Sequence, residues 1–374
     1  MRFTLSSSTL NYQLQTLSKV INSKNSLPIL DCFLFEVADG ELTLTTSDKE
    51  NVMTATLDLD QCDGEGMFAI PNRAVLDAVK ELPDQPLTFE VDLNTYALKV
   101  SYQNGFYNFV AQDGSSFPKA MPLAPDASLM VIPSATVVDF VTRSLFATAQ
   151  DELRPVMNSI FFELNADGLS VVATDAHKLV RNRNFTVKSE EPTSFILPKK
   201  PAQVLKVMLG RTEDEVTIKF DSNNALFAVE GTSLTCRLVE GRYPNYNSVI
   251  PKDNPNLLTI DRKALLSALR RVLPFSSDST HLVRLAMGNG NLEISSQDVD
   301  FAKSAKENIL CDYTGRNMAI GFNGATLGEI LNNLDSEEVV LMLADPSRAG
   351  VIVPAVQPEN EDILTLVMPM MLND

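Results

Sequence analysis

The alternation of apolar and polar residues predicts three similar units along the chain. Three stretches share a turn glycine, an alternating apolar run and a closing aspartate: residues 38–48, 166–176 and 288–298. The closing aspartates lie 127 and 123 residues apart, at Asp48, Asp175 and Asp298. A repeat of this length is a repeated domain, because solenoid repeats span only ~20–50 residues.

Segments with helical periodicity recur in register with these strands. Each copy has one helix before the turn-glycine strand and one after it, predicted at 9–24, 72–82, 134–149, 198–211, 261–275 and 322–334. Alternating strands with hairpin-turn residues at their centres follow each second helix, at 87–100, 216–229 and 339–353. The order predicts an α+β fold with two helices on antiparallel sheet in each copy.

Proline clusters mark the boundaries between the copies, at 117–126 and 250–256. They divide the chain into three predicted domains, residues 1–127, 128–250 and 251–374. The links are short, so we expect the domains to be fixed side by side rather than loosely tethered.

Composition narrows the class of protein. The chain of 374 residues is 44% hydrophobic and has a net charge of −17, which argues against non-specific wrapping of nucleic acid by its whole surface. No apolar run approaches the ~18–20 residues of a membrane span, and the N-terminus does not read as a signal peptide. The widely spaced cysteines are expected to be free, buried thiols in a reducing cytoplasm: Cys32, Cys62, Cys236 and Cys311.

Basic residues concentrate in the predicted helices. The six helical segments hold 13 basic and 5 acidic residues, whereas the rest of the chain holds 18 and 43. Glutamate is as favourable in helices as lysine, so helix propensity does not predict this imbalance. If the helices face one side, they form an electrostatic track for phosphates, and the acidic remainder repels DNA elsewhere. The last helix is the exception, with only Glu329.

Few residues suggest catalysis. Phosphate-loop, dinucleotide and esterase motifs are absent, and the two histidines are His177 and His281. The 58–66 segment resembles a calcium loop only faintly, because Cys62 takes a ligand position, and we interpret it as an acidic hairpin. We therefore expect no catalytic residue, no metal site and no cofactor.

The C-terminal stretch 362–374 carries three methionines around Pro369. One interpretation is a terminal core strand. Proline, however, interrupts strand pairing, and methionine is favoured at adaptable binding surfaces. The second interpretation is therefore the wall of a peptide-binding groove.

Motifs spread over the full length carry a family resemblance: MRFTL at the N-terminus, SLPIL at 26–30, TDAHKL at 174–179, EGRYPNY at 240–246 and VMPM at 367–370. The chain resembles the bacterial sliding clamps, the beta subunits of the replicative DNA polymerase. The resemblance implies a head-to-tail homodimer whose six domains close a ring around double-stranded DNA, with twelve helices lining the hole. It also implies a processivity factor without an active site, which tethers polymerases by topology.

The resemblance further implies a groove between the second and third domains. This groove would bind short linear peptides of polymerase subunits, clamp loader and repair proteins. Its residues would be Met157, Thr174, Ala176, His177, Lys178, Leu179, Pro244, Val249, Val367, Met368, Pro369, Met370 and Leu372. The family often has glycine in place of Ala176 and arginine in place of Lys178.

Two further sets of residues follow. Lys24, Arg73 and Arg154 match DNA-contacting positions of the family, and the helix cations Lys199, Lys200, Lys206, Arg270 and Arg271 are expected to join them in sequence-independent phosphate contacts. At the dimer interface, Leu273 and Phe275 would meet Tyr107 and Phe109 of the other copy, with edge strands pairing across the joint.

Two alternatives stay open at this point. A peptide-binding scaffold that never touches DNA would suit the acidic surface, but it predicts no charge asymmetry in the helices. A hydrolase built on Asp175 and His177 would need a cleft with a nucleophile, and the sequence shows none.

Overall fold

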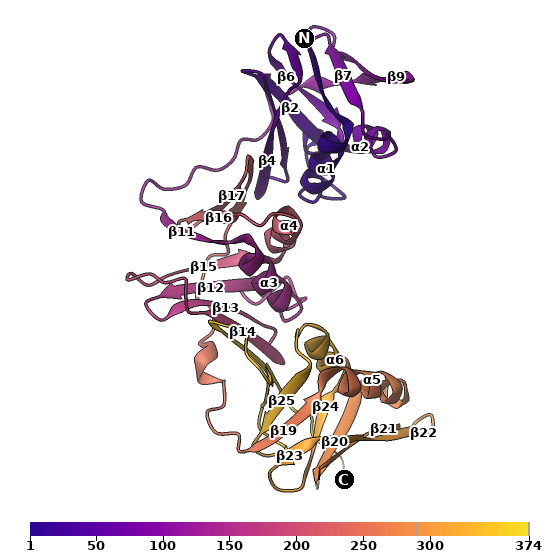
Figure 1. Ribbon diagram of the computed structural model, residues 1–374, viewed down its shortest axis with the longest axis vertical. Helices are drawn as coiled ribbons and strands as arrows, with labels where there is room; N and C mark the ends of the chain where they lie inside the picture. The colour runs from indigo at the N-terminus through magenta and orange to yellow at the C-terminus, as the bar shows by residue number, and fades with distance from the viewer. Residues whose placement is uncertain (289, 373–374) are drawn as a thin grey trace. The chain divides into compact units, whose positions relative to one another are not determined.

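The computed structural model describes residues 1–288 and 290–372, which form two compact units (Figure 1). The first unit comprises Met1–Val138 and Lys200–Leu238, and the second comprises Asp139–Lys199 and the chain from Val239 onward. Each unit therefore contains one terminal repeat and part of the middle repeat.

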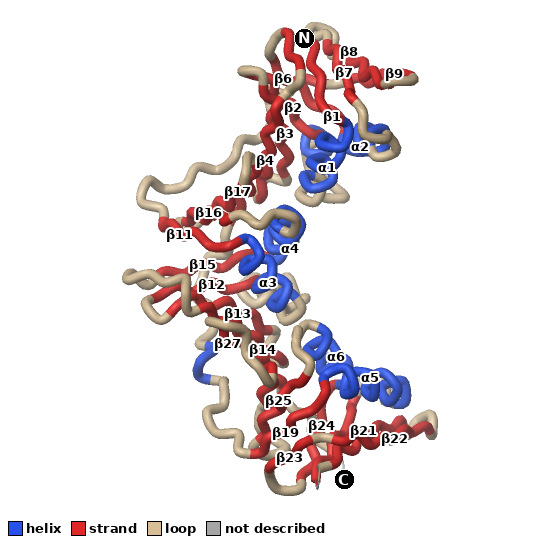
Figure 2. The backbone as a smooth tube through the Cα atoms, in the orientation of Figure 1, coloured by secondary structure: helices blue, strands red, loops and turns tan. Residues whose placement is uncertain are grey.

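The first unit contains two antiparallel sheets (Figure 2). The smaller sheet has the order β5 (Gln61–Asp63), β1 (Arg2–Ser6), β7 (Pro86–Val91), β8 (Ala97–Tyr102) and β9 (Gly105–Val110). The larger sheet runs β10 (Gln112–Asp113), β6 (Gly66–Pro71), β2 (Cys32–Ala38), β3 (Glu41–Ser47), β4 (Asn51–Asp58), β18 (Thr232–Arg237), β17 (Asn224–Val229), β16 (Glu215–Phe220) and β11 (Ser128–Pro133). Because β4 pairs with β18, one sheet crosses from the first repeat into the second.

The second unit is built in the same way. Its larger sheet runs β15 (Thr193–Pro198), β12 (Ser159–Asn165), β13 (Gly168–Thr174), β14 (Lys178–Asn184), β27 (Glu361–Val367), β26 (Gly350–Pro354), β25 (Glu338–Leu343), β19 (Asn256–Asp261) and β23 (Asp312–Thr314). Its smaller sheet has the order β22 (Lys303–Leu310), β21 (Asn291–Asp298), β20 (Leu282–Gly288) and β24 (Met318–Asn323). Here β14 of the second repeat pairs with β27 of the third.

All six predicted α-helices form: α1 (Ser7–Leu17), α2 (Asn72–Val79), α3 (Ser134–Leu145), α4 (Lys199–Leu209), α5 (Arg262–Val272) and α6 (Gly324–Asn332). Short 3-10 turns occur at η1 (Pro28–Asp31), η2 (Tyr246–Ser248) and η3 (Leu273–Phe275). The Asp261 side chain caps α5 as expected, by accepting from the Ala264 N–H. The helix predicted to reach residue 24 ends at Leu17 and continues as single turns, in which the Val20 N–H bonds the Leu17 carbonyl.

The helices of the two terminal repeats, α1, α2, α5 and α6, pack against strands of their own unit. In α5, Leu265, Leu269 and Val272 are fully buried, whereas Arg270 and Arg271 are exposed. This helix lies against β21 and β22, and α6 lies beside it (Figure 1). In the first unit, α1 contacts α2 in the same way. The amphipathic pattern thus places the basic residues on the side of the helices that faces away from the core.

The turn-glycine strands β3 and β13 both have seven residues, although the glycine spacing differs between them. In the first repeat the loop between paired residues Ala38 and Glu41 contains Gly40, with φ of 80°. In the second repeat Gly168 is itself the first paired residue of the strand, with φ of 141°. An added Cβ there would lie 2.4 Å from the Asn184 carbonyl oxygen. The shorter spacing therefore reflects a different turn and not a shorter strand.

The closing aspartates share one local role. Oδ1 of Asp175 accepts hydrogen bonds from the N–H groups of His177 (2.8 Å) and Lys178 (2.9 Å). Asp48 and Asp298 cap their own turns in the same manner, each accepting from the residues two and three positions later. The repeated aspartate is thus a turn cap.

Other expectations need correction or have a local explanation. Residues 58–66 do not form a hairpin, because β5 pairs with β1 instead. All four cysteines are free, but Cys62 is exposed, whereas burial raises the pKa of the Cys236 thiol to about 12. The first proline-rich link is held by the Ala124 N–H, which donates to Asp221. Among the described helices, none is long and apolar enough to cross a membrane.

Candidate functional site

The C-terminal segment of the chain is fixed to two different elements of the second unit. After β27 ends at Val367, the Met368 N–H donates to the His177 carbonyl (2.9 Å). Two residues later the Met370 N–H donates to the Gly321 carbonyl (2.8 Å). Pro369, which has no N–H, lies between these two bonds, so its position costs no hydrogen bond.

Gly321 is required for this arrangement. A Cβ added at Gly321 would lie 2.6 Å from the Met370 carbonyl oxygen and 2.9 Å from side-chain atoms of Leu282 and Leu372. Only a residue without a side chain permits such a close approach of the tail. No sequence motif predicts this role for Gly321, which lies one residue before the helix predicted at 322–334.

The turn beside the tail is rigidly bonded. The Thr174 hydroxyl donates to the Lys178 carbonyl (2.8 Å) and accepts from the Ala176 N–H (3.1 Å). Ala176 has φ of 78°, in the left-handed region that favours glycine. The side chains of Ala176 and His177 are exposed at the top of this turn, beside the tail.

Lys178 is a buried cation with two carboxylate partners. Its Nζ lies 3.0 Å from Asp175 Oδ2 and 3.2 Å from Glu329 Oε2. Burial opposes the charge, but the ion pairs with Asp175 and Glu329 outweigh it and raise the pKa of Lys178 above its ordinary value. The ammonium of Lys178 thus joins β14 to α6. Glu329 is the only charged residue of the helix predicted at 322–334, and this isolated carboxylate is the feature of the sequence that indicates the contact.

An apolar cluster lies beneath the turn and the tail. It contains Leu179 and Leu366 with Tyr243 and Tyr246, and Phe161 stacks on Tyr243 with ring centroids 4.7 Å apart. Val156 and Ile250 pack against the cluster. Four chain segments therefore converge here, and each carries predicted groove residues.

The structure places the predicted residues as follows. Thr174, Lys178, Leu179 and Val367 are buried; Ala176, His177, Pro244, Val249 and Met368 are exposed; Met157, Pro369, Met370 and Leu372 are half-buried. We call this set the tail site. Leu372 lies apart from the apolar cluster, beside Leu282, where it lines a hollow of about 730 Å³ over β20, β21 and β22. Residues 373–374 of the predicted C-terminal stretch lie outside the described residues.

The predicted DNA-contacting residues fall into two groups. Arg154 pairs with Asp151 (3.1 Å) and Arg271 with Glu307, whereas Lys199 and Arg270 bond neutral amide oxygens of Gln150 and Asn332. Within residues 1–288 and 290–372, Lys24, Arg73 and Lys206 are exposed and have no charged partner. The second group is free to attract phosphates.

Lys200 differs from both groups. Its Nζ donates to the Val20 carbonyl (2.5 Å), to Asn22 Oδ1 (2.6 Å) and to Asp48 Oδ2. This ammonium is only partly exposed, and it connects the start of α4 to the first repeat within the first unit.

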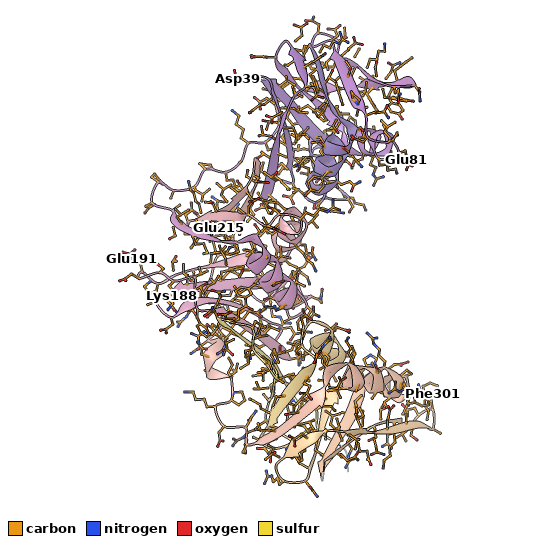
Figure 3. All side chains as sticks on the ribbon, viewed as in Figure 1. Asp39, Glu81, Lys188, Glu191, Glu215 and Phe301 are labelled. Carbon is orange, nitrogen blue, oxygen red and sulfur yellow. The ribbon has the colours of Figure 1, made fainter. Side chains whose placement is uncertain are left out.

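The predicted dimer-interface residues lie at or beside free sheet edges. Tyr107 and Phe109 are half-buried on β9, an edge strand of the five-stranded sheet. In the second unit, η3 contains Leu273 and Phe275 and contacts β22, an edge strand of the four-stranded sheet. Large apolar side chains are exposed near both edges, including Val110 (79%), Leu310 (86%) and Phe301 on the β21–β22 loop (Figure 3).

Asp175 and His177 do not form a catalytic pair. Both carboxylate oxygens of Asp175 are engaged, one by backbone N–H groups and the other by Lys178. Among the residues that the structure describes, no cluster of three or more His, Cys, Asp or Glu side chains could hold a metal ion.

Comparisons with known proteins agree on one family. Models of the N-terminal, central and C-terminal domains of the DNA polymerase III beta subunit match residues 1–119, 131–245 and 247–371. The chain belongs to the beta sliding clamp family. The family is non-catalytic, which excludes the hydrolase interpretation, and its members are the processivity factors of DNA polymerase III. The α+β fold with three clamp domains is therefore confirmed.

Individual relatives match over the full length. The chain is 30% identical over 372 residues to the beta sliding clamp of Salmonella typhimurium and 28% identical over 375 residues to that of Pseudomonas aeruginosa, with 100% of both chains covered in each case. The crystal structure of the Pseudomonas aeruginosa clamp bound to griselimycin superimposes with a TM-score of 0.94 at 26% identity, again over 100% of both chains. The Thermotoga maritima beta subunit gives a TM-score of 0.91 at 25% identity and the same coverage.

Proposed function

We propose that two copies of this chain close a ring around double-stranded DNA and slide along it without sequence preference. Each copy contributes three domains, residues 1–127, 128–250 and 251–374. The ring tethers polymerase subunits, the clamp loader and repair proteins, which bind the tail site through short linear peptides.

The observation that carries this proposal is the repeated sheet joint. The first and second repeats are joined by β4 against β18, and the second and third by β14 against β27. In both joints the strand after an aspartate-capped turn pairs with the last strand of the next repeat. The third repeat has the corresponding strand β22, and the first repeat has the corresponding strand β9; both are edges. Pairing β22 with β9 of a second copy uses the same joint again and closes the ring.

The charge distribution supports the contact with DNA. Within the described residues, the six α-helices carry nine basic and three acidic residues, and seven of the nine lie in α4 and α5. The whole chain has a net charge of −17. A local cationic surface on an acidic protein attracts phosphates at one face while other faces repel them.

The composition of the tail site supports a peptide ligand. Met368 and Val249 are exposed apolar side chains beside the buried cluster of Leu179 and Leu366. Methionine and leucine adapt to several apolar anchors, and the exposed backbone turn at Ala176 and His177 offers polar groups at its rim.

Encirclement is tested by comparing how long the protein stays on circular and on linear DNA. Protein loaded by its clamp loader onto nicked circular DNA should stay bound during gel filtration, and linearising that DNA with a restriction enzyme should release it. Equal retention on both forms would refute encirclement. A scaffold that only binds peptides would show no retention on either form and unchanged peptide affinity.

The tail site is tested by truncation. Deleting residues 368–374 should abolish binding of a polymerase-derived peptide in fluorescence anisotropy, because the deletion removes Met368 and the tail that covers Gly321. The dimer should remain intact in sedimentation. Deleting residues 373–374 alone is the matched control and should leave binding in place. Unchanged affinity after the longer deletion would place the peptide site elsewhere.

A further inference from the structure

We propose that Arg73 of one copy binds Asp298 of the second copy at the dimer interface, in the way that Lys200 binds Asp48 within one chain. The inference rests on the proposed ring, and it gives Arg73 a role in closing that ring in addition to any contact with phosphates. It follows from a comparison of the surroundings of Asp48 and Lys200 with the equivalent positions around Asp298 and Arg73.

The contact between Lys200 and Asp48 is well defined in the first unit. Lys200 Nζ donates to the Val20 carbonyl, to Asn22 Oδ1 and to Asp48 Oδ2. The Asp48 side chain is 5% exposed, so this charge-assisted hydrogen bond is shielded from water. It lies at the start of β4, the strand that pairs with β18.

The acceptor side recurs in the third repeat. Helices α1 and α5 both have 11 residues, and the carbonyl of each last residue accepts from a hydroxyl two positions before the closing aspartate. These bonds run from Thr46 Oγ1 to the Leu17 carbonyl (3.2 Å) and from Ser296 Oγ to the Val272 carbonyl (2.7 Å). Asp298, with 4% of its side chain exposed, is thus held against α5 as Asp48 is held against α1.

The neighbouring acceptors correspond as well. Val20 lies three residues beyond the end of α1, and Phe275 lies three residues beyond the end of α5. The Phe275 carbonyl therefore stands where the Val20 carbonyl receives Lys200. Lys303 Nζ lies 3.4 Å from Asp298 Oδ2 and donates to the carbonyl of Pro274, the residue before Phe275; in the first repeat Asn51 Nδ2 lies 3.0 Å from Asp48 Oδ2. A carboxylate accepts more than two hydrogen bonds, so Lys303 does not exclude a second cation.

The donor side is Arg73. Lys200 is the second residue of α4, and Arg73 is the second residue of α2. Arg73 is exposed and has no partner among the described residues of its own chain. Its guanidinium carries five donors, enough to reach both the carboxylate and the adjacent carbonyl.

The same equivalences fix the register of the proposed joint. Asn51 pairs with Cys236, the fifth residue of β18. The corresponding residues are Lys303, which pairs with Asp298, and Phe109, the fifth residue of β9. The register therefore places Lys303 opposite Phe109 and, two residues on, Ala305 opposite Tyr107. The half-buried side chains of both strands then share the core side of the sheet, next to η3.

The ion pair is tested by the dissociation constant of the DNA-free dimer in analytical ultracentrifugation. Arg73→Gln should raise this constant roughly tenfold, since it removes one partner of a shielded charge pair. Lys24→Gln is the matched control and should leave the constant unchanged. Asp298→Asn keeps an oxygen for the turn and should weaken the dimer similarly, whereas Asp48→Asn should not. The double variant Arg73→Gln/Asp298→Asn should be no weaker than either single variant.

Unchanged dimer affinity of Arg73→Gln, or additive effects in the double variant, would overturn the ion pair while leaving the ring in place. A wild-type chain that stays monomeric at all concentrations would instead refute the ring. If Asp298→Asn fails to fold, the comparison of Arg73→Gln with Lys24→Gln still decides.

The register has an independent readout. In a Cys62→Ser background, Tyr107→Cys and Ala305→Cys should form an intermolecular disulfide on mild oxidation, because directly opposed residues satisfy disulfide geometry. The pair Tyr107→Cys and Glu307→Cys lies two residues out of register and should not. The reverse result would overturn the proposed register.

Discussion

Each repeat ends a strand with an aspartate whose two oxygens have different partners. Oδ1 accepts from the backbone of the turn, and Oδ2 forms an ion pair with a lysine ammonium in all three repeats. The lysine comes from a different place each time: Lys200 from the next repeat, Lys178 from the same turn and Lys303 from the following strand. The aspartate-capped turn is thus the same in all three repeats, whereas the element that supplies its lysine differs.

Ala176→Gly should stabilise the protein. Alanine at φ of 78° pays the left-handed penalty of ~1–2 kcal/mol, which exceeds the ~0.5–1 kcal/mol of extra chain entropy that glycine loses on folding. We expect a gain of about 0.5–1 kcal/mol in the free energy of unfolding, measured by urea denaturation. Ala173→Gly, in a fully buried strand position, is the control and should be destabilising. A loss of stability in Ala176→Gly would contradict the strain argument.

Lys178 should stabilise the fold in a pH-dependent way. Its pKa is raised in the folded state, so its contribution is complete below the unfolded value near 10.5 and disappears as the pH rises through the folded value. Lys178→Met should lower the free energy of unfolding at pH 7 by less than the ~3–5 kcal/mol of a fully buried pair, because Glu329 is exposed, and the deficit should shrink at pH 11. Thermal unfolding at both pH values measures it, with Lys188→Met as an exposed control. A deficit that grows at high pH would have the wrong sign.

At the scale of elements, the two nine-stranded sheets show how neighbouring repeats are attached. The joints are antiparallel strand pairs, so backbone hydrogen bonds carry them and side chains set the register. The Arg237 N–H donates to the Glu50 carbonyl across the first joint (2.8 Å). The N–H groups of Phe106, Asn108 and Val110 hold the corresponding positions on β9. They point away from β8, because the Ala111 N–H bonds the Tyr96 carbonyl on the β8 side.

Asn108→Pro should therefore prevent dimerisation without unfolding the chain. It removes an N–H on the free side of β9, where proline is tolerated, and it leaves the bonds to β8 in place. We expect at least a tenfold weaker dimer in sedimentation, with a near-native circular dichroism spectrum. Asn108→Ala, which keeps the N–H, should dimerise normally. Normal dimerisation of Asn108→Pro would exclude β9 from the joint.

Sequence patterns predict where helices and strands form better than they predict which distant strands pair. The hairpins at 87–100, 216–229 and 339–353 follow from alternation and turn residues, and the helices follow from their apolar faces. The pairing of β4 with β18 joins residues about 180 positions apart, and no local pattern encodes it. For the same reason the sequence predicts Lys200 as a phosphate-binding cation, although in the structure its ammonium binds Asp48. The tail site was outlined by motif, but its supports Gly321 and Glu329 depend on contacts far along the chain.

At the scale of the whole molecule, a strongly acidic chain carries its free cations on a few helical and loop positions. Among the predicted DNA-contacting cations, Lys24, Arg73 and Lys206 have neither a hydrogen-bond nor an ion-pair partner within the described residues. Few unpaired cations predict weak contact with a duplex, which suits the proposed sliding along DNA.

Lys206→Ala should lower the salt dependence of duplex binding. Each phosphate contact contributes about 0.9 to the slope of log K against log salt concentration, so the slope should fall by about that amount. Fluorescence anisotropy with a labelled duplex at several salt concentrations measures it. Arg271→Ala is the control, because Glu307 already neutralises Arg271, and its slope should change less. Equal slopes for Lys206→Ala and the parent would remove Lys206 from the contact surface.

The strand pairing between repeats also affects how the protein is made. Strand β4 leaves the ribosome early, but β18 is translated about 170 residues later, which is roughly 10–35 s at ~5–20 residues per second. The interval between the synthesis of β14 and that of its partner β27 is similar. During each interval the nascent polypeptide displays an unpaired edge that can capture other chains, so crowded polysomes should favour chaperone capture at these two strands.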